Sequence, residues 1–126
     1  MTRNAAHISI VDDDESVRTA LTSLVRSAGF SATGFSSVEE FLASPTLRDT
    51  ACVICDIQMP RVSGLELQAS LTAQHIRTPV ILITAYPDPR LEQQAVRAGA
   101  VCLLKKPFDG DVLLECLTRT LTKPSA

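Results

Sequence analysis

Apolar runs of strand length alternate with segments of helical periodicity five times along this chain. The runs that we expect to form strands cover residues 8–11, 30–35, 51–54, 80–83 and 101–104. Apolar residues recur every three or four positions in the segments that follow, which predicts helices over residues 15–28, 64–74, 89–98 and 109–121 and a short helix ending at residue 43. Strands that are apolar along their whole length are typical of parallel sheets covered by helices on both faces. The pattern therefore predicts an α/β fold with a doubly wound, five-stranded parallel sheet.

Residues at the ends of the helical segments support these boundaries. Asp14 precedes the first segment, and Ser36 or Ser37 precedes the second, where a side-chain oxygen can accept from the exposed backbone N–H groups. Gly29 and Gly99 follow the first and fourth segments, and glycine commonly ends a helix. We therefore interpret Asp14 as a helix cap and not as a ligand.

Polar side chains follow four of the apolar runs at the point where each strand should end. Asp12 and Asp13 follow the first run, Asp56 follows the third, Thr84 the fourth and Lys106 the fifth. In doubly wound sheets the ligand crevice lies beyond the carboxyl ends of the strands. We expect these five side chains to meet at that edge.

Three carboxylates in one crevice repel one another, so the site calls for a cation. Mg²⁺ prefers oxygen ligands and is usually held by one or two carboxylates with waters and phosphate oxygens. We expect Asp13 and Asp56 to bind it directly and Asp12 to act through a water. Asp56 stands alone at the end of the expected central strand, which makes it the better candidate for a nucleophile that forms an aspartyl phosphate. Thr84 and Lys106 can then bind phosphoryl oxygens.

Composition narrows the class of protein. The 126 residues fit one domain, which we place at residues 1–121, with 122–126 as a tail or the start of a linker to an absent output domain. A net charge of −2 gives no basic footprint for nucleic acid, so we expect none to bind this segment itself. We see neither a membrane-spanning run nor a secretion signal, and we expect a cytoplasmic protein.

Four cysteines raise the question of a disulfide or a zinc site. Cys52 and Cys55 have CxxC spacing, but they lie in an expected strand, where residues three apart point to opposite faces. Cys102 lies in another apolar run and Cys116 in a helical pattern, without a histidine at metal-ligand spacing. We expect four reduced thiols, most of them in the core.

The polar residues and their neighbours resemble the receiver domain of bacterial response regulators, from about residue 8 to residue 121. The resemblance is carried by Val11–Asp14, Asp56–Pro60, Thr84–Ala85 and Lys106–Phe108, in the order and spacing of the family. Residues 35–42 and 98–100 are most similar to FixJ-type receivers. The resemblance implies a flavodoxin-like (βα)5 fold with strand order 2-1-3-4-5.

The resemblance also implies roles for the acidic residues. Asp56 would accept a phosphoryl group from a phosphohistidine on a sensor histidine kinase. Asp12, Asp13, Asp56 and the backbone carbonyl of Gln58 would hold Mg²⁺. The protein would then be no enzyme in its own right, beyond its self-catalysed phosphoryl transfer and autodephosphorylation.

Further implied roles concern the strand ends nearer the fifth strand. Thr84 would move to bond the phosphoryl group, and Lys106 would pair with it and precede a cis peptide at Pro107. Family members often carry Tyr or Phe where this chain has Leu103, which puts an inward-rotating aromatic gate in doubt; Tyr86 is the nearby phenol. Phosphorylation would switch the surface of the fourth helix, fifth strand and last helix. We expect a phosphorylation-dependent homodimer. We also expect control of transcription through an output domain.

Three other functions compete with this interpretation. An Asp-nucleophile phosphatase would use Asp12 and Asp14, but the chain holds no sequence for a cap domain. A flavodoxin-like cofactor binder would need a Ser/Thr/Gly-rich phosphate loop where this chain is acidic. A receiver that binds partners without phosphorylation is the third alternative, and failure to label Asp56 would favour it.

Overall fold

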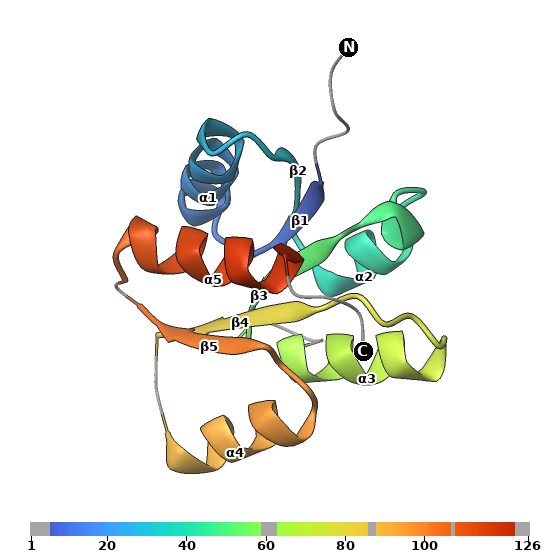
Figure 1. Cartoon of the computed structure of the whole chain (residues 1–126). Helices are drawn as coiled ribbons and strands as arrows, with labels where there is room; N and C mark the ends of the chain where they lie inside the picture. Colours follow the sequence, from blue (N-terminus) through green and yellow to red (C-terminus); the bar gives the residue numbers. More distant parts are fainter. Residues whose placement is uncertain (1–5, 59–62, 86–87, 107, 123–126) are drawn as a thin grey trace.

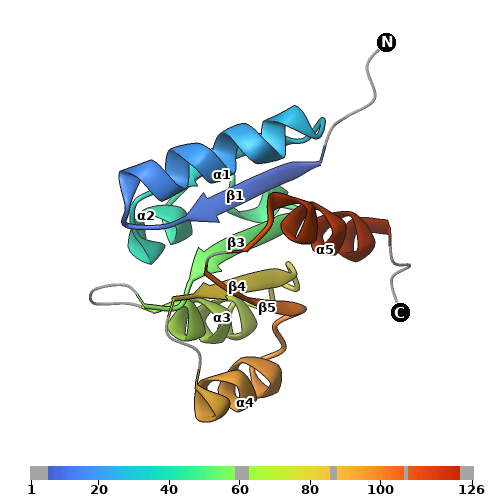
Figure 2. The same cartoon turned by 90° about the vertical axis from the view of Figure 1, so that its left-hand side faces the viewer.

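The structure is a computed structural model and describes residues 6–58, 63–85, 88–106 and 108–122. Five parallel strands form one sheet in the order β2-β1-β3-β4-β5, which confirms the predicted fold and strand order. Helices α1 and α5 cover one face of the sheet, and α2, α3 and α4 cover the other (Figures 1 and 2).

The elements lie within one or two residues of the predicted segments. The strands are β1 His7–Val11, β2 Ser31–Phe35, β3 Cys52–Asp56, β4 Val80–Thr84 and β5 Cys102–Lys105. The α-helices are α1 Glu15–Ser27, α2 Val38–Leu42, α3 Gly64–Ala73, α4 Pro89–Arg97 and α5 Gly110–Thr122, and a 3₁₀ helix, η1, spans Leu47–Asp49. The sequence pattern missed η1, and α5 ends one residue beyond the predicted domain boundary.

Both faces of the central strands are buried, which explains why these strands are apolar along their length. In β3, Ile54 packs toward α1 and α5, whereas its neighbours Val53 and Cys55 pack toward α2, α3 and α4. β4 alternates in the same way between Ile81 and Leu82. The sheet is thus held between two apolar layers, and its strand ends are the places where polar groups gather.

Side-chain caps start the helices as the sequence predicts. Asp14 accepts from the backbone N–H groups of the first turn of α1, and Ser37, rather than Ser36, caps α2. Gly29 and Gly99 adopt φ values of 99° and 92° directly after the last turns of α1 and α4. This left-handed conformation is the one that glycine adopts at little cost.

The prediction of four reduced cysteines is wrong for one pair. Cys102 of β5 and Cys116 of α5 are joined by a disulfide, with 7.0 Å between their Cα atoms. Cys52 and Cys55 are buried free thiols, so the CxxC pair remains open as predicted. The sequence shows no sign of the bond because it depends on how α5 packs across β5.

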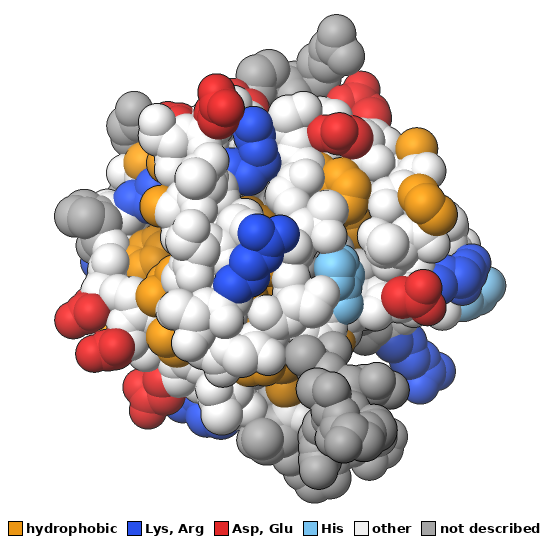
Figure 3. All heavy atoms as spheres, turned by 90° about the horizontal axis from the view of Figure 1, so that it is seen from above, with side chains coloured by type: hydrophobic (Ala, Val, Ile, Leu, Met, Phe, Trp, Pro, Cys, Tyr) orange, Lys and Arg blue, Asp and Glu red, His pale blue; other side chains and the backbone are white. Residues whose placement is uncertain are grey.

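No helix within the described residues is long and apolar enough to cross a membrane. Seen from above in Figure 3, lysine and arginine side chains are scattered among acidic and apolar ones and form no broad basic patch among the atoms drawn.

Candidate functional site

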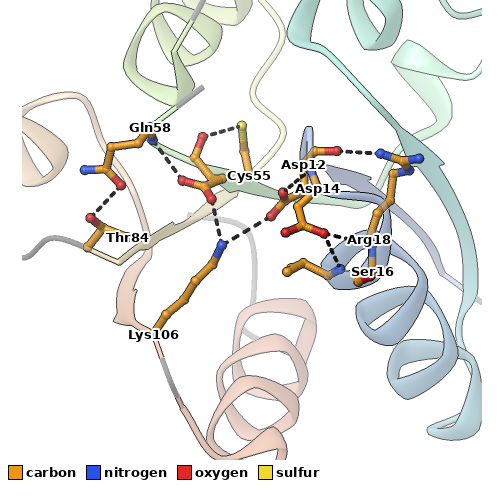
Figure 4. A network of polar contacts seen from close by, with 10 residues as sticks. Asp12, Asp14, Ser16, Arg18, Cys55, Gln58, Thr84 and Lys106 are labelled. Carbon is orange, nitrogen blue, oxygen red and sulfur yellow. Dashed lines mark hydrogen bonds and ion pairs between the residues drawn. The ribbon is translucent and has the colours of Figure 1, made fainter. Parts of the chain in front are cut away.

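The carboxyl ends of β1, β3, β4 and β5 bring four of the predicted side chains together. The strand register pairs Val11 with Cys55, Asp56 with Ile83, and Thr84 with Lys105. The strands therefore end side by side, and the residues at or just after their ends share one crevice (Figure 4).

Lys106 is the centre of the polar contacts in this crevice. Its Nζ donates a hydrogen bond of 2.8 Å to Oδ2 of Asp56 and lies 3.5 Å from Oδ2 of Asp12. Its backbone N–H donates to the carbonyl of Thr84, which extends the β4–β5 pairing by one residue. One ammonium thus interacts with two buried carboxylates, which lie at the ends of two different strands.

Asp12 occupies an unfavourable environment for a negative charge. It is 1% exposed, and burial raises the pKa of its carboxyl although the backbone N–H of Asp14 and the charge of Lys106 lower it. Oδ1 accepts from that N–H at 2.9 Å, but Oδ2 has no hydrogen-bond donor within the described part of the chain. The site therefore holds a buried carboxylate oxygen that lacks a partner other than the shared ammonium.

The environment of Lys106, unlike that of Asp12, favours the charged form of the side chain. Burial lowers its pKa, but the hydrogen bond to Asp56 and the charges of Asp12 and Asp56 outweigh burial, so the pKa rises. The protonated ammonium is the form that the two carboxylates stabilise.

Gln58 closes the crevice on the side of β4. Its backbone N–H donates to Oδ1 of Asp56 at 2.8 Å, and its side-chain Oε1 accepts from Oγ1 of Thr84 at 2.8 Å. Both oxygens of Asp56 are therefore hydrogen-bonded, one to Gln58 and the other to Lys106. The sequence singled out only the backbone carbonyl of Gln58, and the contact between Gln58 and Thr84 was missed because a side-chain pairing has no signal in spacing.

Asp13 and Asp14 lie beside the crevice, and Asp14 joins its contacts only through the backbone N–H that donates to Asp12. Asp13 is exposed, and Asp14 caps α1 through bonds to the N–H groups of Ser16 and Val17. A residue that the sequence did not suggest, Arg18, donates from Nη1 to the backbone carbonyl of Asp12 at 2.8 Å. This contact fixes the backbone at the end of β1 and thereby the direction of the Asp12 side chain.

The donor set suits a hard cation that keeps most of its waters. No group of three or more His, Cys, Asp and Glu side chains within the described residues is arranged as a metal site. Mg²⁺ is nevertheless commonly held by one or two carboxylates, and Asp12 and Asp56 offer two buried carboxylates, one with an oxygen that lacks a hydrogen-bond donor. The residues present therefore fit Mg²⁺.

Of Leu103, Tyr86 and Pro107, which bear on the aromatic gate and the cis peptide, the structure describes only Leu103. Leu103 is partly buried and packs against the apolar layer under α3 and α4. Tyr86 and Pro107, and with it the predicted cis peptide, lie outside the described residues.

Comparison with known proteins identifies the family to which a chain with this site belongs. The sequence model of the response regulator receiver domain matches residues 8–118. The chain belongs to the response regulator receiver family. The receiver is also similar to a crystal structure of FixJ-N, with a TM-score of 0.86 and 35% identity over 100% of this chain and 99% of that one.

Two curated relatives of the receiver are transcriptional regulatory proteins by name. It is 37% identical over 120 residues to the transcriptional regulatory protein TdiR of Thauera aromatica, and 37% identical over 107 residues to the transcriptional regulatory protein FixJ of Bradyrhizobium diazoefficiens. The matches cover 95% and 85% of this chain but 53% and 52% of those proteins. The receiver thus spans about half the length of the curated relatives that it matches.

Proposed function

We propose that this receiver is a phosphorylation-activated switch in which Asp56 accepts a phosphoryl group from a histidine kinase. The observation that carries the proposal is the arrangement around Asp56. Its carboxylate lies at the end of the central strand, its oxygens are oriented by Lys106 and by the backbone N–H of Gln58, and the buried Asp12 lies beside it.

The site residues would divide the work of the transfer. An oxygen of Asp56 attacks phosphorus, and the imidazole of the kinase leaves. Lys106 follows the negative charge from the carboxylate to a phosphoryl oxygen. Mg²⁺, held by Asp12, Asp13, Asp56 and the carbonyl of Gln58, would supply the positive charge that the carboxylates and the phosphoryl group need.

Thr84 would link the site to the rest of the domain. To donate to a phosphoryl oxygen, its hydroxyl must leave Gln58, to which it is bonded at 2.8 Å. Phosphorylation thus favours a second conformer by the difference in free energy between the hydrogen bond of Thr84 to the phosphoryl group and its hydrogen bond to Gln58. Gln58 would hold the unphosphorylated state.

Two surfaces would serve partners of the receiver. An apolar hollow of about 590 Å³ lies between α1 and the start of α5, with Leu21, Leu24 and Phe108 in its lining and Lys106 at its edge, and would receive the kinase. Val96 and Val101, which are 73% and 46% exposed, lie on the α4, β5 and α5 side and would form part of a phosphorylation-dependent homodimer.

The relatives suggest the setting of this switch. Because they are about twice as long and regulate transcription, we propose that residues 122–126 lead to an output domain that binds DNA, while the receiver itself binds none. We propose a cytoplasmic protein that acts on no separate substrate.

Intact-mass spectrometry after incubation with acetyl phosphate and Mg²⁺ tests the central step. We expect one phosphoryl adduct that requires Mg²⁺, is lost in Asp56→Asn and persists in Asp49→Asn, an exposed aspartate on η1. Absence of an adduct in the unchanged protein would favour a receiver that binds partners without phosphorylation.

Sedimentation tests the proposed dimer. We expect beryllium fluoride, a mimic of the phosphoryl group, to raise the sedimentation coefficient at micromolar protein. An unchanged coefficient at saturation would contradict the dimer but not the phosphorylation.

A further inference from the structure

The disulfide between Cys102 and Cys116 joins two elements of the proposed output surface. Cys102 lies in β5 and is partly exposed, whereas Cys116 lies on the inner side of α5 and is 2% exposed. Both belong to the apolar layer between the sheet and the α1 and α5 helices. The two sulfur atoms meet because this layer brings α5 against β5, although 14 positions separate the two residues along the chain.

The other two cysteines lack the features of a redox pair. Cys52 and Cys55 are fully buried, and burial raises the pKa of the Cys52 thiol to about 12 and that of Cys55 above its ordinary value. A thiol reacts as its thiolate, so these two are inert in the folded protein. The fold therefore sets one cysteine pair apart from the other.

The bond encloses the segment that completes the phosphorylation site. The chain between its two cysteines contains Lys106, whose ammonium bridges Asp12 and Asp56, and the connection from β5 to α5. A bond at this position ties the end of β5 farther from the site to the middle of α5, so it constrains how these two elements move relative to each other.

We infer that Cys102 and Cys116 form a reversible redox site by which a hydroperoxide stiffens the output surface of this receiver. The inference rests on the proposed function, because it takes the α4, β5 and α5 surface as the output and the cytoplasm as the location. Disulfides in reducing compartments are usually transient and redox-sensing. A bond in this place is thus a modification that the cell can make and remove.

The chemistry needs one oxidant and one reductant of common classes. The Cys102 thiolate, the more accessible of the two, attacks the hydroperoxide, whose O–O bond breaks to give a sulfenic acid and water or an alcohol. Cys116 then attacks the sulfenic sulfur, an S–S bond forms, and the displaced hydroxide leaves as water with the remaining thiol proton. The two sulfur atoms lose two electrons and the peroxide gains them. A dithiol reductant reverses the step by thiol–disulfide exchange.

Oxidation of the reduced protein tests the site itself. The protein is reduced with dithiothreitol, freed of it, titrated with hydrogen peroxide and mapped by mass spectrometry without reduction. We expect a loss of two hydrogen atoms, a crosslink between the peptides of Cys102 and Cys116, and recovery of both thiols on renewed reduction. Cys55→Ser should behave like the unchanged protein and Cys102→Ser should lose the crosslink. Oxidation to sulfinic acid without a crosslink, or a crosslink that dithiothreitol cannot open in the folded protein, would overturn the inference.

A second measurement tests the stiffening. We expect the oxidised form to unfold at a temperature higher by roughly 10 °C, because a disulfide that closes a loop of the chain restricts the conformations of the unfolded state. Hydrogen exchange in α5 should be slower in the oxidised form and should change less when beryllium fluoride is added. No such differences should follow oxidation of Cys102→Ser. Equal exchange in both forms of the unchanged protein would overturn the regulatory part of the inference.

The two proposals fail in different ways. If acetyl phosphate labels Asp56 in neither redox form while the crosslink forms and opens, the proposed function is wrong and the thiol chemistry stands. If labelling succeeds and the crosslink never forms, the redox site is wrong and the switch stands.

Discussion

Replacing Asp12 with asparagine should make the protein without Mg²⁺ more stable. The Asp12 carboxylate is 1% exposed, its Oδ2 lacks a hydrogen-bond donor within the described residues, and it shares the ammonium of Lys106 with Asp56. Burial is the largest influence on its pKa and raises it, so the folded state favours the uncharged carboxyl. An asparagine keeps an oxygen for the N–H of Asp14 and removes the charge.

The size of the gain follows from these contacts. A buried polar group without a partner costs about 1–3 kcal/mol. The ammonium of Lys106 at 3.5 Å from Oδ2 offsets part of this cost, so we expect Asp12→Asn to raise the free energy of unfolding by about 1 kcal/mol at neutral pH.

The pH dependence of the gain has a definite sign. Because the folded-state pKa of Asp12 lies above its ordinary value of 3.8, the native state binds more protons than the unfolded state in the window above 3.8. The free-energy cost of burying the Asp12 carboxylate is therefore complete at a pH above the folded-state pKa and absent at a pH below the unfolded-state pKa. The advantage of Asp12→Asn should accordingly shrink as the pH falls toward 4.

Urea unfolding of both proteins at several pH values measures the effect. Asp13→Asn provides the matched control, since it removes the same charge from an exposed neighbour and should change stability by less than about 0.5 kcal/mol. Mg²⁺ should stabilise the unchanged protein and have a smaller effect on either variant. An Asp12→Asn protein that is less stable than the original at neutral pH would refute the reasoning, because the carboxylate would then be stabilised by Lys106.

Three other substitutions probe separate parts of the structure. Gly64→Ala should lower the free energy of unfolding by about 1–3 kcal/mol, because a Cβ there would lie 2.9 Å from Cδ2 of Leu82 and 3.1 Å from the carbonyl of Asp56; thermal unfolding measures it. Asp14→Ala should cost about 1 kcal/mol in urea unfolding, through loss of the α1 cap, and leave phosphorylation intact in the mass assay. Lys106→Met should cost about 1–2 kcal/mol at neutral pH, a value reduced because the side chain is 24% exposed, and the loss should fade at a pH above the raised pKa of Lys106.

Much of the site was predictable because the geometry of a parallel sheet leaves little choice. Asp56, Thr84 and Lys106 each follow an apolar run, and neighbouring parallel strands end at the same edge. Asp12 and Asp13 also lie at that edge, but neighbouring residues in an extended backbone point in different directions. The structure directs Asp12 into the crevice and leaves Asp13 exposed, a distinction that composition and spacing cannot make.

What the sequence could not supply depends on contacts between elements. The disulfide of Cys102 and Cys116 requires the packing of α5 on β5, and a 14-residue separation gives no hint of it. The bond between Gln58 and Thr84 joins two side chains whose rotamers are set only in the folded crevice. Patterns of one segment predict that segment, whereas these contacts belong to pairs of segments.

Gly34 of β2 gives the position of Arg18 an unexpected dependence. A Cβ at residue 34 would lie 2.8 Å from Cγ of Arg18, the side chain whose guanidinium bonds to the backbone carbonyl of Asp12. The two positions therefore form an epistatic pair, in which a larger residue at 34 is compatible only with a shorter or differently directed side chain at 18. During divergence of such a chain, a change on an edge strand would thus alter which substitutions remain open at Arg18, beside the proposed phosphorylation site, without any direct contact with that site.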